Sequence, residues 1–156
     1  MFVRYFVDLH LPLAQAEEAL LHSPGDWIPG IAQDAEDLGE HLLAEVGFGP
    51  EGRRVAKRVI IELGNPIRFP SRTVLPMSWR AAERQAFFPT FEADIEVAPL
   101  GPNRTQLSVS ARYEPPLGVV GRAIDRALLH RVAEAIVKDF VDRLADRLQT
   151  LAPSNA

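Results

Sequence analysis

Residues 112–126 read RYEPPLGVVGRAIDR, and this stretch decides the fold. The chain that leads into it, residues 104–113, alternates polar and apolar side chains, which is the pattern of a strand with one buried face. Pro115 and Pro116 then end that strand, because a proline has no N–H to donate to a neighbouring strand. Two glycines follow, and apolar residues then recur at helical spacing almost to the end of the sequence. The stretch therefore predicts a hinge between the last strand of a sheet and a long C-terminal helix.

The C-terminal helix is expected to cover about residues 119–151. Apolar side chains recur every four residues on one stripe, and charged side chains fill most of the opposite face. The stripe consists of Val120, Ile124, Leu128, Val132, Ile136, Phe140, Leu144 and Leu148. A helix of roughly 30 residues is about 45 Å long, which is more than short helices can cover. We therefore expect it to lie across an antiparallel sheet.

The chain before this hinge is expected to form the rest of that sheet and two short helices. Further strands are predicted at 2–10, 54–63, 72–80 and 86–98, and the helices at 13–23 and about 31–46. Pro76 lies inside one of these strands and cannot donate to a ladder, so its position is expected to be a sheet edge or a bulge.

The segment Leu100-Gly101-Pro102-Asn103 predicts a hairpin between the last two strands. Outward residues are even-numbered on both strands, and a short Gly-Pro-Asn loop keeps them on the same face. This register pairs Glu92 with Arg112, Asp94 with Ser110, and Glu96 with Ser108. A slip by one residue would turn the acids towards the core. We therefore interpret the acidic row as solvated strand surface and not as a pair of catalytic carboxylates.

Four segments carry a resemblance to a known family. They are the opening strand followed by Pro12 and a short helix, Trp27-Ile28-Pro29, Leu75-Pro76-Met77-Ser78-Trp79 with the later Phe88-Pro89, and Tyr113-Glu114-Pro115-Pro116-Leu117-Gly118. In these segments and in its order of elements the chain resembles the START-like superfamily, also called SRPBCC, which includes Bet v 1-like proteins and polyketide cyclases.

The resemblance implies an α+β helix-grip fold. In that fold a curved antiparallel sheet wraps around a long C-terminal helix, and two short helices follow the first strand. The family usually has seven strands, whereas the pattern here predicts five or six. One strand is therefore absent or hidden within residues 64–72.

The resemblance also implies a cavity between the sheet and the long helix that holds a small hydrophobic molecule, such as a lipid, a sterol or a polyketide. The expected wall residues are Trp27, Leu38, Leu42, Ile61, Leu75, Trp79, Phe88, Phe91, Ile95, Leu107, Val109, Tyr113, Ile124, Leu128 and Val132. Their size and apolar character suit a ligand pocket of a few hundred Å³. The same residues would equally fill a solid core.

Length and composition predict one domain over residues 1–151 and a loose tail over 152–156. The 156-residue chain is 47% hydrophobic and has no cysteine, which excludes disulfides, thiolate catalysis and thiolate metal sites. Charged residues interrupt the apolar N-terminal stretch, unlike a secretory signal, and no apolar run approaches the roughly 18 residues that span a bilayer. We expect a cytoplasmic protein without membrane insertion.

The net charge of −4 is unevenly distributed along the chain. Residues 1–50 are strongly acidic, and residues 51–80 contain the basic block RRVAKR at 53–58. We interpret this block as an exposed strand face opposite acidic helices, so no nucleic-acid partner is expected.

No catalytic or metal-binding motif emerges from the sequence. No two of its four histidines have the i, i+3 or i, i+4 spacing of metal ligands on a helix, and no GxSxG motif is present. His130 can form a surface pair with Glu134. The polar residues that can point into a cavity are Tyr113, Thr105, Lys57 and His41. No cofactor is implied.

Three functions remain open at this point. The first is a non-enzymatic carrier or sensor of a small hydrophobic ligand. The second is a cofactor-independent cyclase or aromatase that uses inward polar groups for acid–base chemistry. The third is a protein-interaction module with a filled core. Ligand identity, protein partners and oligomeric state lie beyond what the pattern gives.

Overall fold

The structure, a computed structural model, describes residues 2–22, 24–25, 27, 59–81, 90–114 and 126–151. Its strands are β1 (Phe2–Leu9), β2 (Val59–Leu63), β3 (Ile67–Phe69), β4 (Arg72–Ala81), β5 (Thr90–Gly101) and β6 (Arg104–Glu114), and its helices are α1 (Leu13–His22) and α3 (Arg126–Leu151). The predicted second helix at 31–46, the basic block at 53–58 and the hinge at 115–125 lie outside the described residues.

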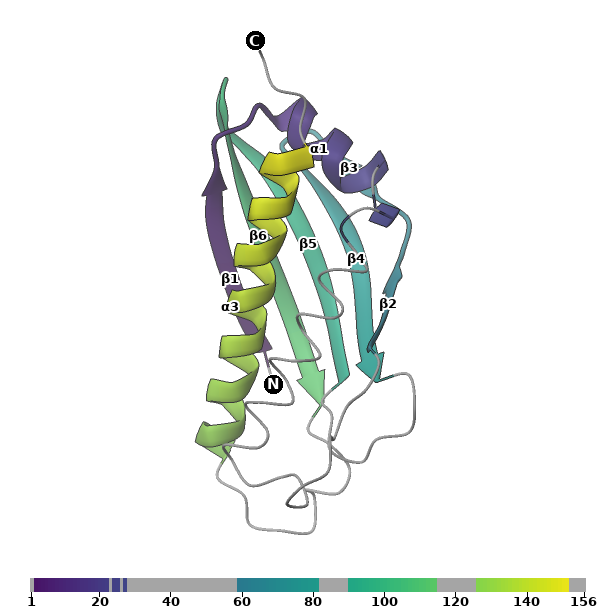
Figure 1. Cartoon of the computed structure of the whole chain (residues 1–156), viewed down its shortest axis with the longest axis vertical. Helices are drawn as coiled ribbons and strands as arrows, with labels where there is room; N and C mark the ends of the chain where they lie inside the picture. Colours follow the sequence, from purple (N-terminus) through teal and green to yellow (C-terminus); the bar gives the residue numbers. More distant parts are fainter. Residues whose placement is uncertain are drawn as a thin grey trace.

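The described strands form one antiparallel sheet in the order β1-β6-β5-β4-β2, and β3 also pairs with β4. Helix α3 lies across one face of this sheet, above β1 and β6, and α1 lies at the end of the sheet near the C-terminal end of α3 (Figure 1). This arrangement confirms the predicted α+β helix-grip fold. We call the sheet face that carries α3 the inner face and the opposite face the outer face.

The register between β5 and β6 is the predicted one. Glu92 lies opposite Arg112, and the pairing continues so that the acidic side chains of β5 point to the outer face. The connection is shorter than predicted, because β5 continues to Gly101 and only Pro102 and Asn103 remain in the turn. A bulge between Pro99 and Gly101 takes up the extra residue.

The strand β4 accommodates Pro76 at a break in its neighbour, not at a sheet edge or at a bulge in β4 itself. On one side of β4, β2 pairs up to Leu63 and β3 begins at Ile67 with its register shifted by one residue. Pro76 faces this break, where its carbonyl accepts a 2.8 Å hydrogen bond from the Gly64 N–H. The N–H that proline lacks would have pointed to the same place. The strand sought within residues 64–72 is β3.

The core lies between the inner face and α3. The inward residues of β4, β5 and β6 are buried, and so is one stripe of α3. The buried stripe consists of Ala133, Ile136, Val137, Phe140, Val141, Leu144, Ala145 and Leu148. The exposed side of α3 carries ion pairs between Lys138 and Asp142 and between Arg143 and Asp139. The predicted stripe is therefore confirmed over the part of α3 whose side chains the structure describes.

Polar contacts hold α1 and its preceding loop against the sheet. The buried Thr105 hydroxyl donates to the Leu11 carbonyl at 2.8 Å, and the Thr73 hydroxyl donates to Glu17 on α1 at 2.7 Å. The indole N–H of Trp27 donates to the Leu20 carbonyl at 3.3 Å. The first two bonds fix the loop before α1 to β6 and α1 to β4, and the third fixes Trp27 to the end of α1.

Candidate functional site

A row of aromatic rings crosses the inner face and continues onto α3. Trp79 lies opposite Phe91, and Phe91 lies opposite Tyr113, so three neighbouring strands each contribute one inward ring. The ring centroids are 5.1 Å apart for Trp79 and Phe91, and 6.0 Å for Phe91 and Tyr113. Phe140 on α3 lies 6.1 Å from Trp79, and His130 lies 6.3 Å from Tyr113. We call these five rings the aromatic row.

The aromatic row ends in polar groups on the Tyr113 side. Tyr113 is only 3% exposed, and burial together with the carboxylate of Glu134 raises the pKa of its hydroxyl above the usual value. The Nε2 atom of His130 lies 3.2 Å from a Glu134 carboxylate oxygen, which confirms the predicted surface pair. This end of the row therefore combines a neutral hydroxyl with a half-exposed imidazole and its carboxylate partner.

The described residues leave little space beside the row. A gap of about 10 Å³ remains between the sheet and α3, which is at most the room of one water molecule. It is lined by Met77, Trp79, Phe91, Ala93, Val109, Ala111, Val137 and Phe140. The side chains themselves fill this part of the expected cavity.

The expected wall residues fall into three groups. Eight of them are buried in the core, namely Trp27, Leu75, Trp79, Phe91, Ile95, Leu107, Val109 and Tyr113. Ile61 is half-buried and packs against that core. The other six are Leu38, Leu42, Phe88 and Ile124, which lie outside the described residues, and Leu128 and Val132, which lie on α3 but whose side chains are not described.

The polar candidates are only partly brought together. Tyr113 points inward as predicted, and Thr105 is buried but already donates to the Leu11 carbonyl. Lys57 and His41 lie outside the described part of the chain. Within that part, no three histidine or carboxylate side chains gather as a metal site would require, and no helix is long and apolar enough to cross a membrane.

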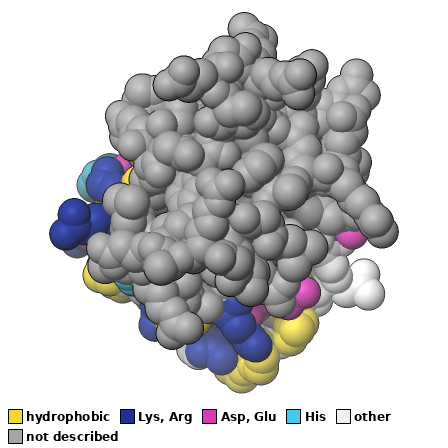
Figure 2. All heavy atoms as spheres, turned by 90° about the horizontal axis from the view of Figure 1, so that it is seen from below, with side chains coloured by type: hydrophobic (Ala, Val, Ile, Leu, Met, Phe, Trp, Pro, Cys, Tyr) yellow, Lys and Arg dark blue, Asp and Glu magenta, His cyan; other side chains and the backbone are white. Residues whose placement is uncertain are grey.

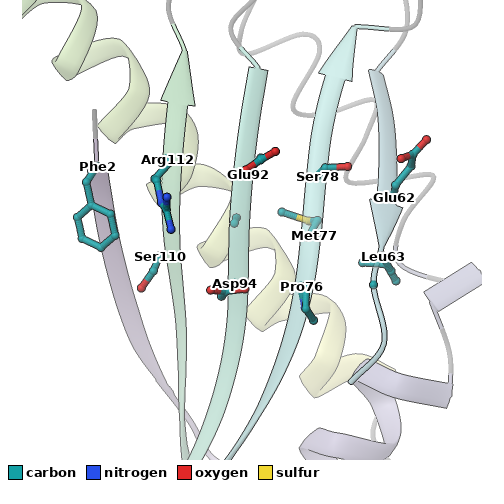
Figure 3. A pocket seen from close by; sticks show the side chains of 12 residues that line it. Phe2, Glu62, Leu63, Pro76, Met77, Ser78, Glu92, Asp94, Ser110 and Arg112 are labelled. Carbon is teal, nitrogen blue, oxygen red and sulfur yellow. The ribbon is translucent and has the colours of Figure 1, made fainter. Parts of the chain in front are cut away.

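A hollow of about 450 Å³ lies on the outer face and was not predicted (Figure 3). Side chains on the outer face of neighbouring strands line it, including Ser110 and Arg112 on β6, Glu92 on β5, and Pro76 and Ser78 on β4. The other lining residues are Phe2, Glu62, Leu63, Gly64, Met77, Ala93 and Asp94. This hollow contains both signs of charge, and the sheet separates it from the aromatic row.

Several solved structures share this arrangement over nearly the whole chain. A conserved protein from Geobacillus kaustophilus is 16% identical, with 98% of each chain covered and a TM-score of 0.54. A hypothetical protein from Helicobacter pylori is 11% identical, covers 98% of this chain and 88% of its own, and has a TM-score of 0.55. The described elements form the helix-grip fold that the resemblance to START-like proteins implied. At these identities the likeness concerns the fold alone.

A START superfamily protein from Mycobacterium smegmatis also matches, with 14% identity, 97% of this chain and 99% of its own covered, and a TM-score of 0.42. No protein-family profile matches the chain, and no curated protein matches it in sequence.

Some residues of the site were missed at the sequence level although their position pointed to it. Met77, Ala93 and Ala111 line the gap and share strand parity with the predicted wall residues, and that parity is the signal that could have found them. His130 was expected only as a surface residue, whereas its ring also lies beside Tyr113. Only the packing of α3 on β6 reveals that second contact.

Proposed function

We propose that this protein binds a small hydrophobic molecule, of the lipid, sterol or polyketide-like kind, as a carrier or sensor. In this proposal the ligand lies between the inner face and α3, with its apolar body along the aromatic row. The observation that carries the proposal is the row itself, because it joins stacked apolar rings to a polar end formed by Tyr113, His130 and Glu134. An apolar surface with a few convergent polar groups is typical of small-molecule sites.

The position of α3 supports the same proposal. The helix packs mainly on β1 and β6, so β4 and β5 lie beyond the strands that it mainly covers (Figure 1). The small gap beside Phe140 means that a ligand cannot simply fill a space there. We propose that the ligand reaches the row from the Tyr113 end, where His130 is 39% exposed.

The filled gap also favours a second candidate, a protein-interaction module with a solid core. A solid core needs no ligand, and the outer face of β1 exposes two phenylalanines. The enzyme alternative would require Tyr113, Lys57 or His41 to point into the cavity together, and Lys57 and His41 lie outside the described residues.

Native mass spectrometry separates these functions. The protein should be purified from its host and measured before and after organic extraction. The carrier proposal predicts an additional mass that disappears on extraction and names the ligand class. A clean mass of the chain alone, unchanged after incubation with fatty acids, sterols and aromatic polyketides, would contradict it and leave the interaction module.

A further inference from the structure

The strand β1 forms an edge of the sheet that no other described strand of the chain pairs. The strand order of the sheet places β1 at one end, next to β6. No described strand pairs with the other side of β1 (Figure 1). The strand is eight residues long, reads FVRYFVDL, and contains no proline, glycine or bulge. Edge strands are normally protected by features such as a proline or a bulge, because their open row of N–H and C=O groups can pair with another chain.

The side chains of β1 are unusually apolar for an open edge. Phe2 and Phe6 are each 58% exposed and are the most exposed large hydrophobic residues of the described chain. In the end-on view, exposed hydrophobic side chains lie next to lysine or arginine side chains at the margin of the molecule (Figure 2). On the inner face, Tyr5 and Val7 stay half-buried although Val3 and Leu9 beside them are buried. Both faces of β1 thus have apolar surface that a further strand would cover.

We propose that β1 pairs with β1 of a second copy of this chain, antiparallel, to form a dimer with one continuous sheet. Outer-face residues must pair with outer-face residues, so only a few registers are possible. Centring the pair on Phe6 places Arg4 of each copy opposite Asp8 of the other. Centring it on Arg4 would oppose the two arginines, and centring it on Tyr5 would pair Arg4 with Phe6.

The register centred on Phe6 also satisfies the apolar side chains. It brings the two Phe6 rings together on the outer face, and aromatic cross-strand pairs stabilise antiparallel sheets. On the inner face it places Tyr5 opposite Val7 of the other copy, so the half-buried residues cover each other. Asp8 already pairs with Arg104 of its own β6, and its second oxygen remains for Arg4 of the second copy. This inference does not depend on the ligand proposed above.

A charge exchange tests both the dimer and its register. Sedimentation equilibrium of the wild-type chain should give twice its mass of 17.3 kDa, with a concentration dependence that defines a Kd. Arg4→Asp alone should be monomeric, because two carboxylates would then face each other across the interface. Asp8→Arg alone should be monomeric because two guanidinium groups would face each other in the same way. An equimolar mixture of the two variants should dimerise again, because each copy then supplies the charge that the other lacks.

A second pair of variants separates the interface from a general effect on the fold. Phe6→Lys should weaken the dimer at least about tenfold. Phe69→Lys changes an exposed phenylalanine on β3 and should leave the dimer unchanged. Circular dichroism of each variant establishes that it is folded.

Two results would overturn the proposal. One is a wild-type chain that stays monomeric throughout the concentration series. If that monomer sediments with phosphatidylglycerol vesicles, the two phenylalanines serve a lipid surface instead. The other is a wild-type dimer that neither Arg4→Asp nor Phe6→Lys weakens, because its interface would then lie elsewhere.

Discussion

Tyr113 contributes both an apolar ring to the core and a hydroxyl whose pKa is raised. It closes the aromatic row on the inner face, and its hydroxyl is held in the neutral form by burial and by the nearby carboxylate of Glu134. A neutral hydroxyl at the end of an apolar surface can donate a hydrogen bond to a ligand oxygen. Strand parity was enough to predict that Tyr113 points inward. It could not predict the neighbouring His130, because that contact depends on how α3 is placed.

The raised pKa of Tyr113 makes a prediction about stability at high pH. In the unfolded chain the hydroxyl loses its proton near the usual pKa of 10.0, whereas in the folded chain it does so at a higher pH. The stabilising contribution of the neutral hydroxyl is therefore complete below pH 10 and is lost as the pH rises through the folded-state pKa. Urea unfolding across this range should show a steeper loss of free energy for wild type than for Tyr113→Phe. An equal pH dependence of the unfolding free energy in wild type and Tyr113→Phe would contradict a raised pKa for Tyr113 in the folded chain.

At the scale of elements, β4 shows how a proline is kept inside a sheet. Its missing N–H falls where β2 ends and β3 begins, and Gly64 approaches Pro76 closely at that point. A Cβ atom on Gly64 would lie 3.1 Å from the Cβ of Pro76, whose ring has little freedom to move. The break was not predictable in detail, because β3 has only three residues, too few for an alternating pattern to identify a strand.

Gly64→Ala is therefore expected to destabilise the protein by about 1 kcal/mol through this crowding. Gly25→Ala serves as the matched control, since a Cβ there meets nothing within 4 Å and the backbone is helical. Alanine at that position should stabilise by about 0.5 kcal/mol, because it restricts the unfolded chain. Chemical unfolding of both variants measures the difference. Equal changes in the free energy of unfolding of Gly64→Ala and Gly25→Ala would show that the contact with Pro76 does not affect stability.

The hairpin of β5 and β6 shows what the alternation of polar and apolar residues can predict and what it cannot. Alternation on both strands, together with a turn between them, specified which residues face each other, and the structure has that register. The bulge before Gly101 was not visible in the sequence, because the alternation has already ended there. Period and parity determine pairing, whereas loop geometry depends on local backbone conformation.

At the scale of the whole molecule, the order of elements predicted the helix-grip fold, and the described residues show it. The stripe of α3 and the apolar parity of the strands required one large buried interface between them. The hollow on the outer face could not be predicted, because it depends on the sizes of side chains from five strands that only the complete sheet brings together. The same holds for the size of the gap beside the aromatic row.

The central claim is that a hydrophobic ligand lies on the inner face between the sheet and α3. Two neighbouring residues of β6 test it, because Ala111 faces the gap and Ser110 lines the hollow on the outer face. The measurement is the affinity for the fluorescent probe 1-anilinonaphthalene-8-sulfonate in Ala111→Leu and Ser110→Leu, with thermal unfolding as the check on folding. The account predicts binding at least about tenfold weaker in Ala111→Leu and unchanged in Ser110→Leu. Unchanged binding in Ala111→Leu, or a loss confined to Ser110→Leu, would contradict it.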